Sequence, residues 1–209
     1  MNRTPQLILG AFLAFVSAWL GVVAYSYVKL GHLEPKVDDA SGASVPPALS
    51  GLAVAGQRVY AANGCVYCHT QQVRPGYLSS DIEKKLGPRR TVARDYLWDQ
   101  PAFTGFTRIG PDLSNYGLRA PAAGEIHRKL YEPAHVLSGS IMPSFRSLYK
   151  LRKISGQPSA DALLNLTGPH APQAGYEVIP TEEAKVLVAY LLSLKRDYPL
   201  PEAPPEAAP

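Results

Sequence analysis

Both cysteines of this chain lie in one short motif, Cys65-x-x-Cys68-His69. Two thiols three positions apart can form thioether bonds to the two vinyl groups of one porphyrin, and the adjacent imidazole is then held under the iron as an axial ligand. A Cys-x-x-Cys-His motif is typical of covalent c-type haem attachment. The sequence therefore predicts one haem c, attached through Cys65 and Cys68, with His69 as an iron ligand.

Two other uses of paired cysteines fit less well. A structural zinc site needs four ligands, and the chain has no second cysteine pair to complete one. A thioredoxin-like redox pair does not require the following histidine, and no strand-helix-strand pattern surrounds the motif. The thioether interpretation also leaves no free thiol and no disulfide.

A six-coordinate haem iron needs a second ligand opposite His69. The chain has only two methionines, Met1 and Met142, and Met142 lies in Ile141-Met142-Pro143, where the following proline stiffens the loop. Met142 is thus the predicted second metal ligand, and a thioether ligand raises the reduction potential. The competing candidates are the remaining histidines, of which His135 is nearest in sequence to Met142; the others are His32, His127 and His170.

The elements that would carry this site begin with a membrane segment. Residues 7–28 form 22 consecutive positions without a formal charge, about 33 Å as a helix, against a bilayer hydrocarbon core of about 30 Å. A cleaved signal peptide is the alternative, but its apolar core is usually shorter. We expect a retained single-pass anchor.

The composition of the chain excludes few classes of function. The net charge of +4 and the pI near 9.0 indicate a mildly basic surface. No array of basic and aromatic residues suggests nucleic-acid binding, so none is expected as a partner. The length of 209 residues suits one domain of ordinary size beside the anchor.

Sequence patterns divide the chain into four parts. Residues 1–29 are the anchor, residues 30–51 a flexible Pro- and Ser-containing tether, residues 52–198 the folded domain, and residues 199–209 a disordered Pro, Ala and Glu tail. Apolar spacing predicts helices at 52–62, 123–131 and 159–166. A last helix opens with acids at 182 and 183 and ends with Lys195 and Arg196.

This order of a helix, the Cys-x-x-Cys-His motif, loops and a C-terminal helix resembles the class I cytochrome c fold. The expected fold is mainly α, with an N-terminal transmembrane helix. In that family a proline carbonyl accepts the N–H of the proximal imidazole, and Pro111 in Gly110-Pro111-Asp112-Leu113 is the matching residue. Arg74 and Arg119 are candidates to pair with haem propionates, because guanidinium groups bind carboxylates in a fork.

A more specific resemblance extends beyond the haem motif. The continuation Thr70-Gln71-Gln72-Val73-Arg74-Pro75 is similar to the haem region of the monohaem subunit II of cbb3-type cytochrome c oxidases. The similarity is collinear from about residue 52 to 194. It passes through the segments 95–103, 108–113, 117–119, 126–133 and 140–143.

The resemblance implies an electron-transfer subunit with no catalytic chemistry of its own. The donor would be a dihaem or soluble cytochrome c, and the acceptor the haem-copper catalytic subunit of the oxidase. Since c-type haem is attached outside the bacterial cytoplasmic membrane, the haem domain is expected in the periplasm, with the anchor in the inner membrane.

Three other functions remain open at this stage. A nitric oxide reductase cytochrome c subunit also has one anchor and one haem, but should lack the Gln-x-x-Arg-Pro continuation. A free-standing electron shuttle would use the tether to swing. A peroxidase would need an open sixth position, which Met142 argues against.

Overall fold

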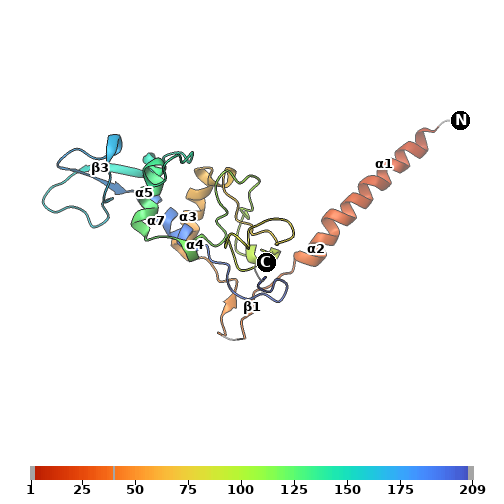
Figure 1. Ribbon diagram of the computed structural model, residues 1–209. Helices are drawn as coiled ribbons and strands as arrows, with labels where there is room; N and C mark the ends of the chain where they lie inside the picture. Colours follow the sequence, from red (N-terminus) through yellow and green to blue (C-terminus); the bar gives the residue numbers. More distant parts are fainter. Residues whose placement is uncertain (1–2, 40, 207–209) are drawn as a thin grey trace.

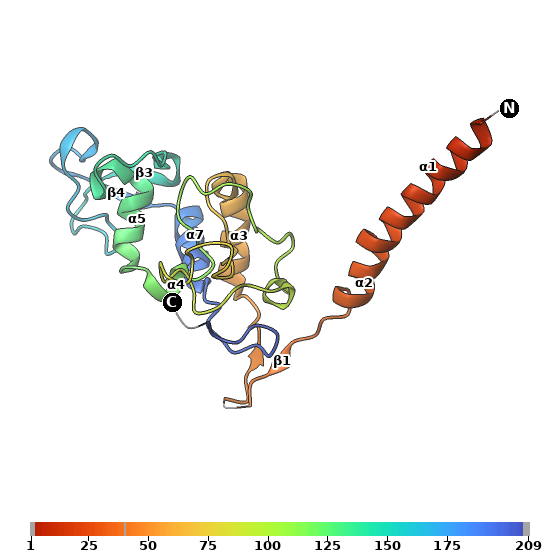
Figure 2. The ribbon, with the colours of Figure 1, turned by 45° about the vertical axis from the view of Figure 1, so that its right-hand side comes forward.

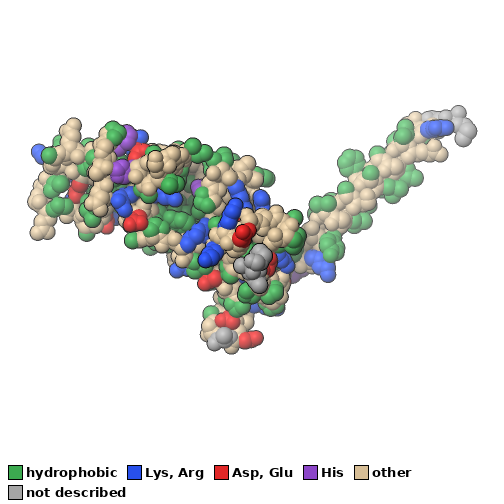
Figure 3. All heavy atoms as spheres, viewed as in Figure 1, with side chains coloured by type: hydrophobic (Ala, Val, Ile, Leu, Met, Phe, Trp, Pro, Cys, Tyr) green, Lys and Arg blue, Asp and Glu red, His purple; other side chains and the backbone are tan. Residues whose placement is uncertain are grey.

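The computed structural model describes residues 3–39 and 41–206, and it begins with one long exposed helix. This helix contains α1 (Thr4–Ala18), a π-helical turn η1 (Trp19–Ala24) and α2 (Tyr25–Leu30). An 18-residue window within its 27 residues has a mean hydropathy of 2.4, and none of that window is buried. It stands apart from the body as a rod covered with hydrophobic side chains (Figures 1 and 3). The helix is long and apolar enough to cross a membrane once.

The segment that follows the anchor is more ordered than the sequence pattern predicts. Two short strands, β1 (Lys36–Val37) and β2 (Ser44–Val45), pair antiparallel. Val45 is only 6% exposed. The Nε1–H of Trp98 donates to the carbonyl of Pro46 at 2.8 Å, and the guanidinium of Arg94 binds the carbonyl of Glu34. The segment predicted as a flexible tether, residues 30–51, is therefore held by two side chains that lie 50 to 60 residues further along the chain.

The body is mainly helical, as expected, with short elements joined by long loops. Its elements in chain order are α3 (Gly51–Ala62), η2 (Cys65–Tyr67), η3 (Ala93–Tyr96), α4 (Tyr116–Arg119), α5 (Ala123–Tyr131), α6 (Pro133–Val136), η4 (Arg146–Leu148), β3 (Tyr149–Lys153), η5 (Gly168–His170), β4 (Tyr176–Pro180) and α7 (Glu182–Ser193). The helices predicted at 52–62 and 123–131 are present.

Helices α3 and α7 pack against each other at the centre of the body (Figure 2). Ser50 and Thr181 cap their N-termini, each side-chain oxygen accepting from the backbone N–H three residues on at 3.3 Å. Gly56 of α3 lies against the backbone of α7, where a Cβ would overlap the carbonyl oxygen of Val186. This close approach is possible because glycine has no side chain.

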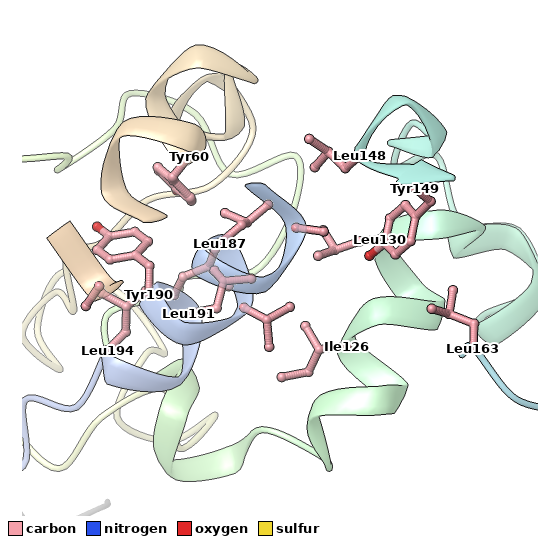
Figure 4. Close-up of a cluster of buried hydrophobic side chains, with 14 of the residues drawn as sticks. Tyr60, Ile126, Leu130, Leu148, Tyr149, Leu163, Leu187, Tyr190, Leu191 and Leu194 are labelled. Carbon is pink, nitrogen blue, oxygen red and sulfur yellow. The ribbon is translucent and has the colours of Figure 1, made fainter. Parts of the chain in front are cut away.

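The hydrophobic core surrounds α7. Leu187 and Leu191 of α7 lie in one buried cluster with Ile126 and Leu130 of α5 (Figure 4). On the opposite side, the ring of Tyr60 from α3 lies 5.4 Å from the ring of Tyr190 in an edge-on arrangement. Both α3 and α5 therefore pack against α7 through the core.

No helix forms at residues 159–166, where one was predicted, and this segment lies beside a two-stranded sheet. Strands β3 and β4 pair antiparallel, with Leu151 opposite Val178. The chain at 159–166 is instead bound to β4, where Leu163 is buried and its N–H donates to the carbonyl of Val178 at 2.9 Å. The apolar spacing of this segment reflects contact with the core, and no helix forms there.

The C-terminal segment also differs from expectation. Helix α7 ends at Ser193, and Arg196 lies beyond it, 6% exposed, with its guanidinium 2.6 Å from Asp99. Residues 199–206 pack against the body instead of being disordered, since Leu200 is 2% exposed and Glu202 forms an ion pair with Arg94 at 2.5 Å. The remainder of the predicted tail, 207–209, lies outside the described residues.

The close contact at Gly56 gives a stability test. We expect Gly56→Ala to lower the free energy of unfolding by about 3 kcal/mol, because the added methyl group forces α3 and α7 apart. Urea denaturation followed by circular dichroism measures the change. Gly51→Ala is the matched control, since a Cβ at the first turn of α3 meets no atom within 4 Å. Equal stability of the two variants would contradict this packing.

Candidate functional site

The Cys-x-x-Cys-His motif forms a single tight turn after α3. Gly64 adopts a left-handed conformation with φ of 69°, which L side chains rarely adopt, and it redirects the chain into η2. The N–H groups of Cys68 and His69 both donate to the carbonyl of Cys65, at 3.2 and 3.0 Å. The turn brings the two half-buried thiols and the imidazole together.

The ring of His69 has a defined orientation and tautomer. Its Nδ1 lies 2.8 Å from the carbonyl oxygen of Pro111. A carbonyl can only accept a hydrogen bond, so Nδ1 carries the proton and Nε2 keeps its lone pair. Burial lowers the pKa of His69 below its ordinary value, and this effect outweighs the opposing hydrogen bond to Pro111. The imidazole is therefore neutral at neutral pH, which is the form that binds a metal.

His69 opens onto a mostly apolar hollow between the motif and helices α5 and α7. Met142, from the loop that follows α6, lines the same hollow as His69. The remaining lining residues are Pro111, Leu113, Tyr116, Ile126, Lys129, Leu130 and Leu191. The structure thus brings together the two predicted axial ligands, which are 73 positions apart in the sequence.

The loop that carries Pro111 runs alongside the haem motif. The N–H of Gly110 donates to the carbonyl of Cys68 at 2.9 Å, and the N–H of Leu113 donates to the carbonyl of Thr70 at 2.8 Å. A Cβ on Gly110 would overlap Cε1 of His69 and lie 2.8 Å from its Nε2. Glycine at this position leaves the imidazole the space it occupies.

Asp112 adds side-chain hydrogen bonds to this contact. Its carboxylate is fully buried and accepts from the Thr70 hydroxyl at 2.6 Å, from the Gln72 N–H at 2.7 Å and from the Ser114 N–H at 2.9 Å. Arg108 donates from Nε to the Thr70 hydroxyl at 2.9 Å. Each buried polar atom of Asp112 thereby has a partner, as burial of a carboxyl group requires.

Gln71, in the segment that follows the haem motif, has a structural role. Its side chain is fully buried, and its amide lies 3.0 Å from the hydroxyl of Tyr190 on α7. Its backbone carbonyl accepts from the Tyr96 hydroxyl at 2.7 Å and from the buried guanidinium of Arg196 at 3.0 Å. The chain just after His69 is therefore fixed directly to the C-terminal helix.

Arg108 and Asp81 support the same region from outside. Arg108 binds both oxygens of the Asp81 carboxylate, and Asp81 also accepts from the N–H of Arg74 at 2.8 Å. Burial alone would raise the pKa of Asp81, but the hydrogen bonds from Arg108 and Arg74 outweigh it and hold the pKa below its ordinary value. This ion pair stays charged at neutral pH.

The two arginines proposed for haem propionates lie outside the hollow. Arg119 places its guanidinium on the carbonyls of Asp112 and Leu86, and over the ring of Tyr116 at 5.8 Å. Arg74 is held through its backbone. Neither belongs to the described residues that line the hollow, so their role toward propionates stays a prediction.

The competing histidines also lie elsewhere. His135 is exposed, with its Nε2 3.3 Å from the Thr167 hydroxyl. His127 is 3.1 Å from the Tyr149 hydroxyl, His170 is 2.8 Å from a guanidinium nitrogen of Arg146, and His32 packs on the ring of Tyr27. Among the described residues, His69 is the histidine that lines the hollow.

Sequence reasoning missed the supporting residues Gln71, Asp112 and Arg196, and it missed Lys129. Lys129 lies on α5 between the buried Ile126 and Leu130 and lines the hollow. Lys129 precedes the core residue Leu130 on an amphipathic helix, and this pattern could have indicated that Lys129 lies at the edge of the hollow. The ammonium group is the one formal positive charge among the described lining residues.

The residues present fit a covalently attached haem. The hollow offers an apolar lining, a neutral imidazole with a free Nε2 and a thioether from another loop. Burial raises the pKa of Cys65 to about 11, so its sulfur is a thiol at neutral pH. The described residues contain no group of three or more His, Cys, Asp and Glu side chains that could hold a bare metal ion, and the donor set matches haem chemistry instead.

The space at Gly110 yields a second test. We expect Gly110→Ala to displace the His69 ring from Pro111 and to reduce covalently bound haem severalfold, because the methyl group would occupy the position of the imidazole. A pyridine haemochrome assay per mole of purified protein measures haem content. Gly124→Ala, on α5 where a Cβ meets no atom within 4 Å, should keep the wild-type content. Full haem loading of Gly110→Ala with an unchanged spectrum would contradict the geometry.

Comparison with known proteins shows the family of this chain. The family model described as cytochrome c oxidase, mono-haem subunit/FixO, matches residues 15–167, which include the end of the anchor, the haem motif and Met142. A search of the curated proteins finds no match. The family match covers well over half of the chain, and it sets aside the nitric oxide reductase, peroxidase and free-shuttle alternatives. The chain belongs to the FixO family, the monohaem cytochrome c subunit of cbb3-type oxidases.

Proposed function

We propose that this chain carries one haem c on Cys65 and Cys68, with His69 and Met142 as axial ligands. Through it the chain relays single electrons from a dihaem or soluble cytochrome c to the haem-copper catalytic subunit. The observation that carries this proposal is the shared hollow, which His69 and Met142 line together from two distant parts of the sequence.

The distribution of the other ligands supports methionine over a second histidine. Each competing histidine has a contact outside the hollow, so bis-histidine ligation would require a loop to rearrange. Met142 already packs against the core beside the hollow. A histidine and methionine ligand pair gives a higher potential than two histidines, which suits delivery of electrons toward oxygen.

The chain's own residues perform three tasks in this proposal. Pro111 holds the Nδ1 proton of His69, which directs the Nε2 lone pair into the hollow. The side chains of Leu113, Ile126 and Leu191 exclude water from the hollow. The lower local dielectric constant is one of the factors that set the reduction potential of a haem. A haem bound there supplies one electron reversibly, through iron that alternates between its ferric and ferrous states.

The pinned tether supports a fixed position in an assembly. We place the anchor in the bacterial cytoplasmic membrane and the body in the periplasm. A swinging shuttle needs a free linker, whereas Trp98 and Arg94 hold the described tether at Pro46 and Glu34. With the body held this way, the distance from the membrane to the hollow is set by the fold.

Replacing the sixth ligand tests the haem assignment. We expect Met142→His to keep the covalent haem and to lower the midpoint potential by roughly a few tenths of a volt, within the span of about 0.8 V that axial ligands set. Redox titration of the purified protein followed by visible absorption measures the shift. His135→Ala is the control and should leave spectrum and potential unchanged.

An effect of His135→Ala on the ferrous spectrum, together with no effect of Met142→His, would assign the ligand to His135 and contradict the proposal.

Purification of the assembly tests the proposed partners. The membranes are extracted with detergent, and the chain is purified through an affinity tag on its N-terminus. We expect haem b and copper to be recovered with it, and the purified complex to consume oxygen when a reduced cytochrome c is added. The Met142→His variant is the matched control, which should assemble equally but consume oxygen more slowly. Recovery of this chain with haem c alone would contradict the role as an oxidase relay.

A further inference from the structure

The hydrogen bond between His69 and Pro111 depends on neighbours, because Pro111 has no N–H of its own and is exposed. Its carbonyl can stay at Nδ1 of His69 only if the residues on both sides are fixed. On the N-terminal side, Gly110 is bound to the carbonyl of Cys68. On the C-terminal side stands the buried carboxylate of Asp112.

Asp112 joins the two segments across this contact. Oδ2 accepts from Thr70 and Gln72, which follow His69, while Oδ1 accepts from Ser114 on its own segment. The backbone bond from Leu113 to Thr70 lies beside it. Three of these bonds bridge the two segments within three residues of the His69 and Pro111 pair.

Arg108 fixes the direction of the shortest of these bonds. Its Nε–H donates to the Thr70 hydroxyl at 2.9 Å, so that oxygen is already an acceptor on that side. The single hydroxyl proton is then free to point to Asp112, 2.6 Å away. Arg108 thereby acts on Asp112 through the Thr70 hydroxyl, and its own guanidinium also forms an ion pair with the Asp112 carboxylate at 3.7 Å.

We infer that Asp112 is a positioning residue, which holds the Pro111 carbonyl at Nδ1 of His69 and so sets the basicity of Nε2 toward iron. The inference rests on the proposed function, since it takes His69 as the haem ligand. An imidazole whose other ring nitrogen donates to a good acceptor is a stronger base, and a stronger base favours ferric over ferrous iron. The Asp112 contacts therefore lower the reduction potential.

Two variants separate positioning from charge. Thr70→Val removes the hydroxyl donor and keeps the carboxylate. Asp112→Asn removes the negative charge and keeps one oxygen that can accept from Thr70 and Gln72. Ser114→Ala is the matched control, because the buried Ser114 Oγ has no hydrogen-bond partner among the described residues while its backbone N–H stays in place.

Each variant is purified as the full chain, and two properties are measured. One is the midpoint potential. The other is the rate of hydrogen–deuterium exchange of the His69 Nδ1 proton in the reduced, diamagnetic protein, followed by NMR. We expect Thr70→Val to raise the potential and to speed exchange about tenfold, as the loss of one hydrogen bond implies. Asp112→Asn, which keeps the acceptor for Thr70 and Gln72, should raise the potential through the loss of charge and leave exchange close to wild type. Ser114→Ala should change neither.

Unchanged potential and exchange in Thr70→Val would overturn the inference. A raised potential in Asp112→Asn with unchanged exchange in both variants would also overturn it, because the carboxylate would then act through its field alone. If Asp112→Asn fails to fold, Thr70→Val decides the question.

Failure of the proposed function has a different result: wild-type protein without covalent haem, or a Met142→His spectrum identical to wild type.

Discussion

The contact between the Cys-x-x-Cys-His turn and residues 110–114 is the constraint on which the site depends. The turn cannot fix the imidazole of His69 by itself. Its hydrogen bonds are between backbone groups, so the ring could still rotate about the two bonds of its side chain. The neighbouring loop removes that freedom through the Pro111 carbonyl. Gly110 makes the close approach possible, since it leaves the ring its space. The α3 and α7 pair then holds both segments in place.

Polar groups, as well as apolar packing, connect this contact to the core. Gln71, Asp112 and Arg196 are buried, and each has hydrogen-bond partners that differ in sequence by tens of residues. A buried polar group without partners costs several kcal/mol, roughly. Alternative arrangements of these loops would leave such groups unpaired. The network therefore favours one arrangement of the segments around the hollow more strongly than apolar contacts alone could.

Local features of the chain were predictable, whereas long-range pairings were not. The haem motif, the apolar helix and the helices at α3 and α5 follow from spacing, caps and composition over short windows. The buried position of Arg196 depends on Asp99, almost a hundred residues away, and a basic residue after a helix otherwise indicates a solvated end. The hydrogen bond between Trp98 and the tether, and the bond of Leu163 to β4 in the segment predicted as a helix at 159–166, are also long-range pairings.

For the site itself, the sequence indicated His69, Pro111 and Met142, and the structure brings them to one hollow. The likeness to a known loop indicated Pro111, and the scarcity of methionine indicated Met142. The predicted propionate role of Arg74 and Arg119 came from residue type alone, which does not say where a guanidinium will point. Asp112 was missed because a Gly-Pro-Asp sequence is common in turns and carries no signal of burial.

Arg94 joins three regions that are far apart in the chain. Its guanidinium binds the carbonyl of Glu34 near the anchor and the carboxylate of Glu202 in the C-terminal segment, while Glu206 accepts from the N–H of Gly76 at 3.0 Å. Local opening of proteins occurs in cooperative units defined by such contacts. Glu34 and Glu202 share the guanidinium of Arg94, so opening of the C-terminal segment also removes one of the contacts that hold Arg94 beside the chain leading to the anchor.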